Sequence, residues 1–160
     1  MYLAEIVLDA RHPLPVRQLA AVLLKQYVDH HWWKHEDKFR PPETTPAAKA
    51  AIRDLLPRGT ASFFLRERRS DVDGAIDLFF FFTGLDDANS KIRLGVAHAI
   101  SAVAHWDWPD EWPTLFDTMM VLLMRGGGDG LHGSMSVLLE VTLNVDEKQM
   151  HQVHPRLLPF

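Results

Sequence analysis

The sequence predicts an all-α protein built from stacked pairs of helices, and three observations support this class. Apolar residues recur with the 3.6-residue period of an α-helix along most of the 160 residues. Proline, glycine and helix-capping residues separate these periodic segments in the order helix, turn, helix, turn. Alternate helices are expected to begin near Lys91 and Leu131, and this spacing of 40 residues lies within the period of about 40 to 47 residues of HEAT and armadillo units. We therefore predict a HEAT-repeat α-solenoid, which is an α-α superhelix.

Composition narrows the class of protein. A hydrophobic content of 47% with 24% charged residues fits a globular chain, and no apolar run reaches the roughly 20 residues of a membrane-spanning helix, so we expect no membrane insertion. The absence of cysteine excludes disulfides, thiolate nucleophiles and sulfur-ligated zinc. A net charge of -4 argues against direct nucleic-acid binding and leaves basic partners possible. The first residues lack the features of a secretory signal, which favours the cytoplasm or the nucleus.

Two helices are predicted in the first 30 residues. The first is short and lies at the N-terminus, with Leu3, Ile6 and Val7 on its apolar side. The second follows Pro13 and Pro15, which are residues typical of a helix start. Its helical spacing places five apolar residues on one face, and these are Val16, Leu19, Ala20, Leu23 and Tyr27.

The next two predicted helices have clear capping signals. Thr45 is expected to cap a helix that begins at Pro46. The sequence PRG at 57–59 is expected to end this helix. Its apolar stripe consists of Ala48, Ala51, Leu55 and Leu56. Asn89 or Ser90 is expected to cap a helix over residues 91–105. The residues of that helix that should face inward are Ile92, Val96, Ala99, Ile100 and Val103.

The stretch AHWDWPDEWPTLF at 104–116 is predicted to be a corner between two helices. Pro109 should push Trp108 out of the helical conformation, and Asp110 should cap a helix whose first three residues are Glu111, Trp112 and Pro113. Pro113 is acceptable there because first-turn N–H groups have no intrahelical partner. Trp106, Trp108 and Trp112 could form a cage for a cation or a proline-rich peptide, but we expect them to fill the space between packed helices.

Three further segments complete the predicted array. The helix after the corner continues through Leu115, Phe116, Met119, Leu122 and Leu123 to the glycine-rich RGGGDG. The next occupies about 131–143, with Leu131, Met135, Leu138 and Thr142 aligned, and another begins near Val153. Residues 60–84 have no steady period and contain the sticky sequence LFFFF, so we expect an unstructured insertion, with a partner-binding loop as the alternative.

Two short motifs could indicate chemistry. GDGLHG at 128–133 matches the dinucleotide pattern G-x-G-x-x-G, with Asp146 and Glu147 at a suitable distance, but a glycine-rich helix terminus explains the same residues. His31 and His35 have the i, i+4 spacing of metal ligands, but no third ligand is evident, and His98 is expected on a polar helix face. We therefore expect no catalytic activity, no metal and no cofactor. A dinucleotide-binding enzyme fragment is the least favoured of the three functions that we consider for this chain.

Four stretches of the chain carry a resemblance to a known family. They are VRQLAAVLLKQYVDHHW at 16–32, KFRPPETTPAAKAAIRDLLPRG at 38–59, KIRLGVAHAISAVAHWDWPDEWPTLF at 91–116 and LHGSMSVLLEVTLNV at 131–145. The most specific features are the Arg-Gln-Leu-Ala sequence that begins at Arg17, the Leu24-Lys25 pair and the Trp-Pro corner. Together they resemble the N-terminal region of the importin-β, or karyopherin-β, family of nuclear transport receptors.

The resemblance implies a division of the chain and a set of partners. Residues 1–59 would form the N-terminal domain, with a partial first repeat and a second; 60–84 would be an insertion; 85–127 and 128–160 would be two further repeats, the last truncated. Receptors of this family carry cargo between cytoplasm and nucleus and release it when Ran-GTP binds. The implied partners are Ran-GTP, nucleoporins and basic cargo such as core histones or ribosomal proteins.

The family arrangement also implies where partners bind. The inner helices, 46–56, 111–124 and the one that begins after Val153, would line a concave surface, and stacked helix pairs offer such a surface for wrapping a partner. The polar residues expected there are Lys49, Arg53, Asp54, Glu111, Thr114, Asp117 and Thr118. Acidic residues among them would attract basic cargo. The alternative function is a helical-repeat interaction scaffold with no role in transport.

Overall fold

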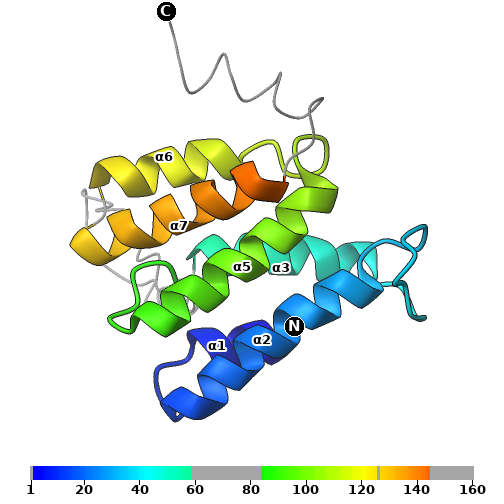
Figure 1. Cartoon of the computed structure of the whole chain (residues 1–160), viewed down its shortest axis with the longest axis horizontal. Helices are drawn as coiled ribbons and strands as arrows, with labels where there is room; N and C mark the ends of the chain where they lie inside the picture. Colours follow the sequence, from blue (N-terminus) through cyan, green and yellow to red (C-terminus); the bar gives the residue numbers. More distant parts are fainter. Residues whose placement is uncertain (1, 59–83, 126, 145–160) are drawn as a thin grey trace, which may run out of the picture.

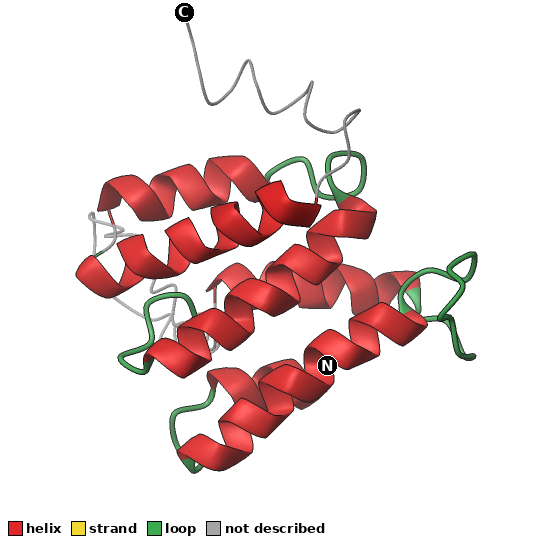
Figure 2. Cartoon of the chain, viewed as in Figure 1, coloured by secondary structure: helices red, strands yellow, loops and turns green. Residues whose placement is uncertain are grey.

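The structure of the protein is a computed structural model, and it describes residues 2–58, 84–125 and 127–144. Every regular element in these ranges is a helix, which confirms the all-α class (Figure 2). The helices are α1 (Tyr2–Leu8), α2 (Leu14–His31), α3 (Pro46–Arg58), α5 (Ser90–Asp107), α6 (Leu115–Arg125) and α7 (Gly128–Asn144). None of the described helices is long and apolar enough to cross a membrane. The predicted insertion at 60–84, apart from Gly84, and the predicted helix near Val153 lie outside the described residues.

The helices form two layers. In the outer layer α5 packs against α2 on one side and α7 on the other, and these three helices run in the same direction (Figure 1). The inner layer consists of α1, α3 and α6, which alternate with the outer helices along the chain and pack against α2, α5 and α7 respectively. This stacking of antiparallel helix pairs is the HEAT-repeat arrangement that the 40-residue spacing predicts.

Local sequence signals set the starts of α3 and α5 as predicted. The Thr45 hydroxyl accepts a hydrogen bond from the Ala48 N–H at 3.3 Å, and Pro46 is the first residue of α3. The Asn89 side chain accepts from the Lys91 N–H at 3.0 Å, which identifies Asn89 rather than Ser90 as the cap of α5. Each cap satisfies a backbone donor that has no partner within its helix.

The core is centred on α5. All five of its predicted inward residues are fully buried, and helices from both layers meet them. The largest side chains that complete this core include Trp32, Leu24, Ile52, Leu56 and Met119. Burying a side chain of this size contributes about 1.5 to 3 kcal/mol relative to leaving it in water. The core therefore holds both layers together and fixes the surface that the inner helices present.

The apolar rows predicted on one face of α2 and of α7 are largely exposed, so these rows are not the sides that pack into the core. In α2 the residues that face the core are Arg17, Ala20, Ala21, Leu24 and Val28, and Ala20 is the only predicted one among them. In α7 they are Gly130, Gly133, Ser134, Val137 and Val141, whereas Leu131, Met135 and Thr142 are exposed. Both helices carry more apolar residues than one face needs, and the period alone does not show which face is covered.

The corner between α5 and α6 differs from its prediction in one respect. Trp108 is extended, with φ −92° and ψ 138°, as Pro109 requires, but α6 begins at Leu115 and not at Glu111. The N–H groups of Glu111 and Trp112 both donate to the Asp107 carbonyl, at 2.8 and 2.9 Å. These bonds fold 108–114 into turns, so Asp110 does not cap α6 and Pro113 precedes the helix.

The tryptophans of the corner pack as predicted. Trp108 and Trp112 are buried and Trp106 is partly buried against the core. The rings of Trp108 and Phe116 meet edge to face with centroids 4.9 Å apart, a favourable geometry for aromatic rings. Trp108 and Trp112 therefore fill the space between packed helices.

The structure overturns the dinucleotide interpretation of GDGLHG. Residues 119–124, which would have to form the preceding strand, belong to α6, and Gly128–Gly133 form the first turns of α7. Gly133 of this motif is needed for its small size, because a Cβ there would lie 2.1 Å from the Leu85 carbonyl oxygen. The metal interpretation of His31 and His35 fails as well, since α2 ends at His31 and places His35 in the following loop.

Candidate partner-binding surface

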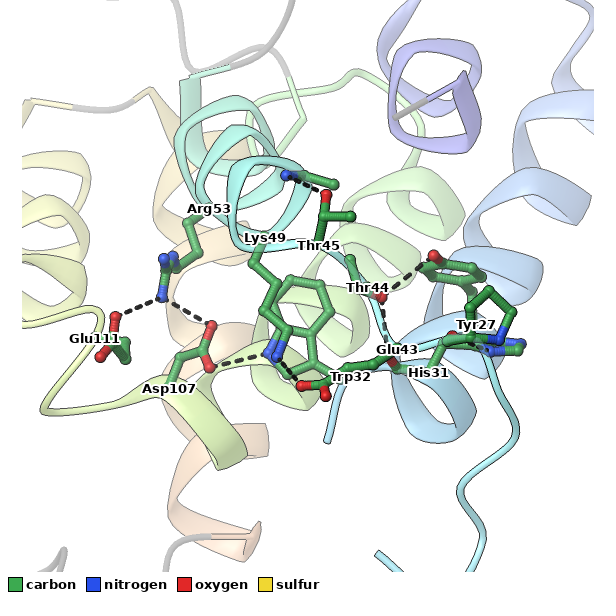
Figure 3. A network of polar contacts seen from close by, with 12 residues as sticks. Tyr27, His31, Trp32, Glu43, Thr44, Thr45, Lys49, Arg53, Asp107 and Glu111 are labelled. Carbon is green, nitrogen blue, oxygen red and sulfur yellow. Dashed lines mark hydrogen bonds and ion pairs between the residues drawn. The ribbon is translucent and has the colours of Figure 1, made fainter. Parts of the chain in front are cut away.

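The seven predicted contact residues separate into two groups by exposure. Asp54 on α3, Glu111 and Thr114 before α6, and Asp117 on α6 are exposed, and Thr118 is half-buried. The side chains of Lys49 and Arg53 are only 13% and 14% exposed. Both cations point into a network of polar side chains that joins α2, α3 and the end of α5 (Figure 3).

Asp107 is the centre of this network. Its carboxylate accepts a hydrogen bond from Trp32 Nε1 at 2.9 Å and one from Arg53 NH1 at 3.1 Å. Arg53 also lies 3.8 Å from the carboxylate of Glu111, which is 73% exposed. Trp32 directly follows α2 as its C-cap, Arg53 lies on α3, and Asp107 ends α5, so one buried carboxylate connects two neighbouring helix pairs.

Burial and hydrogen bonding act on Asp107 in opposite directions. Removal from water raises the pKa of the Asp107 carboxyl above its usual value of 3.8, and the hydrogen bond from Trp32 and the charge of Arg53 oppose this rise only in part. The ionised form of Asp107 therefore costs free energy in the folded state relative to the unfolded chain. Two good donors keep that cost small enough for the carboxylate to remain in the core.

Lys49 occupies a second part of the network. Its Nζ lies 2.9 Å from Glu43 Oε1 and 5.7 Å from the ring centroids of both Trp32 and Trp33, which is within cation–π range. The hydrogen bond from Lys49 lowers the pKa of the Glu43 carboxyl. Lys49 is thus largely buried and paired within the protein.

Thr44 anchors the loop between α2 and α3. Its N–H donates to the His31 carbonyl at 2.8 Å, and its hydroxyl oxygen lies 2.9 Å from the same carbonyl and 3.2 Å from the Tyr27 hydroxyl. The Arg40 N–H donates to the His30 carbonyl at 2.7 Å. The loop is therefore tied to the end of α2, which fixes the start of α3 and with it Lys49.

A second buried network joins α2 to α7. Arg17, from the Arg-Gln-Leu-Ala motif, donates from Nε to the Val7 carbonyl at 2.8 Å and forms an ion pair with Asp87. Arg93 donates to the Asp87 carbonyl at 2.6 Å and pairs with Asp129 of α7 at 2.8 Å. Arg17 is almost fully buried, so this part of the family motif holds α1, α2 and the segment before α5 together.

Sequence reasoning did not identify Trp32, Glu43 and Asp107 as the partners of the two cations. Arg53 and Asp107 are 54 residues apart, and no local spacing connects them. The consequence for the surface is electrostatic. Because Lys49 and Arg53 are paired internally, the exposed charges among the predicted contact residues are the carboxylates of Asp54, Glu111 and Asp117. The described residues contain no group of three or more potential metal ligands.

The two perturbed carboxyl groups predict opposite effects of pH on stability. The pKa of Asp107 is raised, so the stability of the wild type relative to Asp107→Asn should increase as the pH falls and the folded state takes up the proton more readily. The pKa of Glu43 is lowered, so the stability of the wild type relative to Glu43→Gln should decrease as the pH falls.

Urea denaturation of the three proteins from about pH 3 to about pH 6, where carboxyl groups titrate, measures both differences. The difference between wild type and each variant is compared across pH, so a constant offset caused by the substitution does not matter. If the stability difference between wild type and variant changed with pH in the same direction for Asp107→Asn and Glu43→Gln, the opposite pKa shifts of the two carboxyl groups would be contradicted.

Comparisons with known proteins agree with this structure. The importin-beta N-terminal domain family matches residues 1–62, which include α1, α2 and α3. Importin-9 of Drosophila melanogaster is 35% identical over 162 aligned residues, covering 99% of this chain. Importin subunit beta-5 of Schizosaccharomyces pombe is 26% identical over 90% of the chain, and importin beta-like protein KAP120 of Saccharomyces cerevisiae is 27% identical over 76%.

These relatives are much longer than the chain. It spans 13% of the length of the Drosophila protein, 12% of the S. pombe protein and 9% of the S. cerevisiae protein. The similarity to importin-9 nevertheless extends over nearly the whole chain and confirms the resemblance that the sequence motifs indicate. The N-terminal domain match, the similarity to three importins and the stacked helix pairs together show that this chain belongs to the importin-β family.

Proposed function

We propose that this chain acts in nuclear import, as the part of a transport receptor that binds Ran-GTP and basic protein cargo along its inner helices. Core histones and ribosomal proteins are the proposed cargo, and nucleoporins are the proposed partners during passage between cytoplasm and nucleus. The observation that carries this proposal is the importin-beta N-terminal domain over α1 to α3. The inner layer, which contains α3 and α6, is the proposed contact surface.

The charge of that surface supports a basic partner. Asp54 is exposed on α3, and Glu111 and Asp117 are exposed before and on α6, while the cations Lys49 and Arg53 are held in internal ion pairs. Carboxylates on a rigid helical surface attract a basic partner over roughly the Debye length, which is about 8 Å at physiological salt. Binding of basic cargo should therefore weaken as the salt concentration rises.

A pull-down with Ran tests the transport function directly. The immobilised 160-residue chain is incubated with Ran loaded with GTP or with GDP, and bound Ran is quantified. A receptor retains the GTP form in clear excess over the GDP form. Equal retention of the two forms, or retention of neither, would refute Ran binding by this chain and leave the scaffold function as the remaining interpretation of the helical repeats.

Neutralising the exposed carboxylates is expected to weaken histone binding. An exposed ion pair contributes about 0.2 to 1 kcal/mol, so the double variant Glu111→Gln, Asp117→Asn should lose roughly two- to thirtyfold in affinity for purified core histones. Fluorescence anisotropy at two salt concentrations measures this loss, which should shrink at the higher one.

The matched control is Asp29→Asn, which removes a carboxylate from the outer helix α2. This variant should bind histones with the affinity of the wild type. A similar loss from Asp29→Asn and from the double variant would mean that net charge, and not the inner surface, attracts the histones.

A further inference from the structure

The sequence Thr-Thr-Pro at 44–46 places two threonines in different environments directly before α3. Thr44 is only 4% exposed, and its hydroxyl lies against the Tyr27 hydroxyl and the His31 carbonyl. Thr45 is exposed, and its hydroxyl points toward the first turn of α3 (Figure 3). An enzyme in solution can therefore reach the hydroxyl of Thr45, whereas that of Thr44 is covered.

Pro46 distinguishes Thr45 from every other hydroxyl residue of the chain. Among the 160 residues, Thr45 is the only Ser or Thr that proline follows. Proline has a fixed φ and lacks a backbone N–H, so an enzyme pocket that accepts proline can select this position by shape. Proline-directed protein kinases phosphorylate Ser or Thr residues in this position. Pro46 is exposed together with Thr45, so such a kinase can reach both residues.

The backbone around Thr45 can open at small cost. Protein kinases bind the residues around the acceptor hydroxyl in an extended conformation, and the three residues before Pro46 already lie outside any helix. Extension past Thr45 breaks the bond from the Ala48 N–H to its hydroxyl, at 3.3 Å, and the bond from the Lys49 N–H to its carbonyl, at 2.9 Å. Both bonds belong to a helix end, where local opening requires the least free energy.

A phosphate on Thr45 would find donors at the start of α3. The N–H groups of Ala47 and Ala48 lie in the first helical turn, where donors have no partner within the helix. A phosphate brings a charge of about −2 and three acceptor oxygens, and the helix dipole favours negative charge at this end. The nearby carboxylate of Glu43 is paired with Lys49 at 2.9 Å, so its charge is compensated.

We propose that Thr45 is a phosphorylation site for a proline-directed protein kinase, and that the phosphate stabilises α3. In this reaction the Thr45 hydroxyl oxygen forms a bond to the γ-phosphorus of ATP, the bond from that phosphorus to the bridging oxygen breaks, and ADP leaves. The hydroxyl proton passes to the catalytic aspartate of the kinase. The proposal does not depend on the proposed transport function.

Incubation of the full 160-residue chain with a purified cyclin-dependent kinase and MgATP tests the proposal. Mass spectrometry should locate a single phosphate on Thr45. Thr45→Val should take up no phosphate, and Thr45→Ser should be phosphorylated. Pro46→Ala keeps the hydroxyl and should react roughly tenfold more slowly or less, since one fitted pocket contact discriminates by about this factor. Circular dichroism establishes that each variant keeps the helix content of the wild type.

Thermal denaturation of the purified phosphorylated chain tests the effect on α3. Its Tm should lie about 1 to 4 °C above that of the unmodified chain, and the difference should shrink at high salt. A wild type that takes up no phosphate would overturn the proposal, as would phosphate mainly on a residue other than Thr45, an unreactive Thr45→Ser, or reaction of Pro46→Ala at the wild-type rate. An unchanged or lower Tm after phosphorylation would overturn the stabilising role.

Discussion

Replacing Trp32 with alanine is expected to reduce the free energy of unfolding by about 4 kcal/mol, because truncation of a buried tryptophan leaves a cavity in the core. Trp32 is 0% exposed and is among the largest fully buried side chains of the described residues. The substitution also removes the hydrogen bond that Trp32 Nε1 donates to Asp107. The buried carboxylate then keeps Arg53 as a donor and loses the other.

Trp33 provides the matched control for this prediction. It has the same side chain at the next position but is 44% exposed, and its described contacts are with His35 and Lys49. Trp33→Ala should cost less than about 1 kcal/mol, the value of a cation–π contact at an exposed site. Urea denaturation of the two variants and the wild type gives both differences. Similar losses for Trp32→Ala and Trp33→Ala would show that Trp32 is not the residue that joins the two helix pairs.

Features that local signals decide could be predicted from sequence in detail. In α5 the capping residue, the inward residues and the end at the Trp-Pro corner all follow from local rules, and each agrees with the structure. The start of α3 at Pro46 is equally local, since a single hydroxyl group decides it. These features require no knowledge of residues more than a few positions away.

The covered faces of α2 and α7 depend on neighbouring helices, and the sequence does not specify which neighbour is present. An outer helix of a solenoid is apolar on both sides because it packs between two others. In α2 the larger apolar residues Val16, Leu19 and Leu23 form the exposed side, while the small Ala20 and Ala21 allow the close packing of the covered side. Size alone therefore indicates the wrong face.

The polar network could not be predicted for a different reason. Lys49 and Arg53 lie on α3 at positions that a helical repeat normally exposes, and their sequence neighbours contain no partner for Arg53. Only the fold brings Asp107 and Glu43 to them. The result is that both cations are largely buried in ion pairs, whereas the carboxylates of Asp54, Glu111 and Asp117 are exposed.

Replacing Gly133 with alanine is expected to destabilise the protein by about 3 kcal/mol, because the added methyl group cannot be accommodated. A Cβ at this position would lie 2.1 Å from the Leu85 carbonyl oxygen and 2.9 Å from its carbonyl carbon. Both atoms belong to the backbone of the turn before α5, so no side-chain rotation relieves the clash. The helix α7 would have to move away from this turn, which weakens its packing on α5.

Gly128 in the same helix is the control, because its Cβ would meet nothing within 4 Å. Gly128→Ala should be neutral or stabilising by up to about 1 kcal/mol, since alanine has the higher helix propensity and restricts the unfolded chain. Thermal and urea denaturation of both variants separates the two positions. If Gly133→Ala were as stable as Gly128→Ala, the contact between α7 and Leu85 would not exist. Gly133 would then require another explanation than the close approach of two backbones.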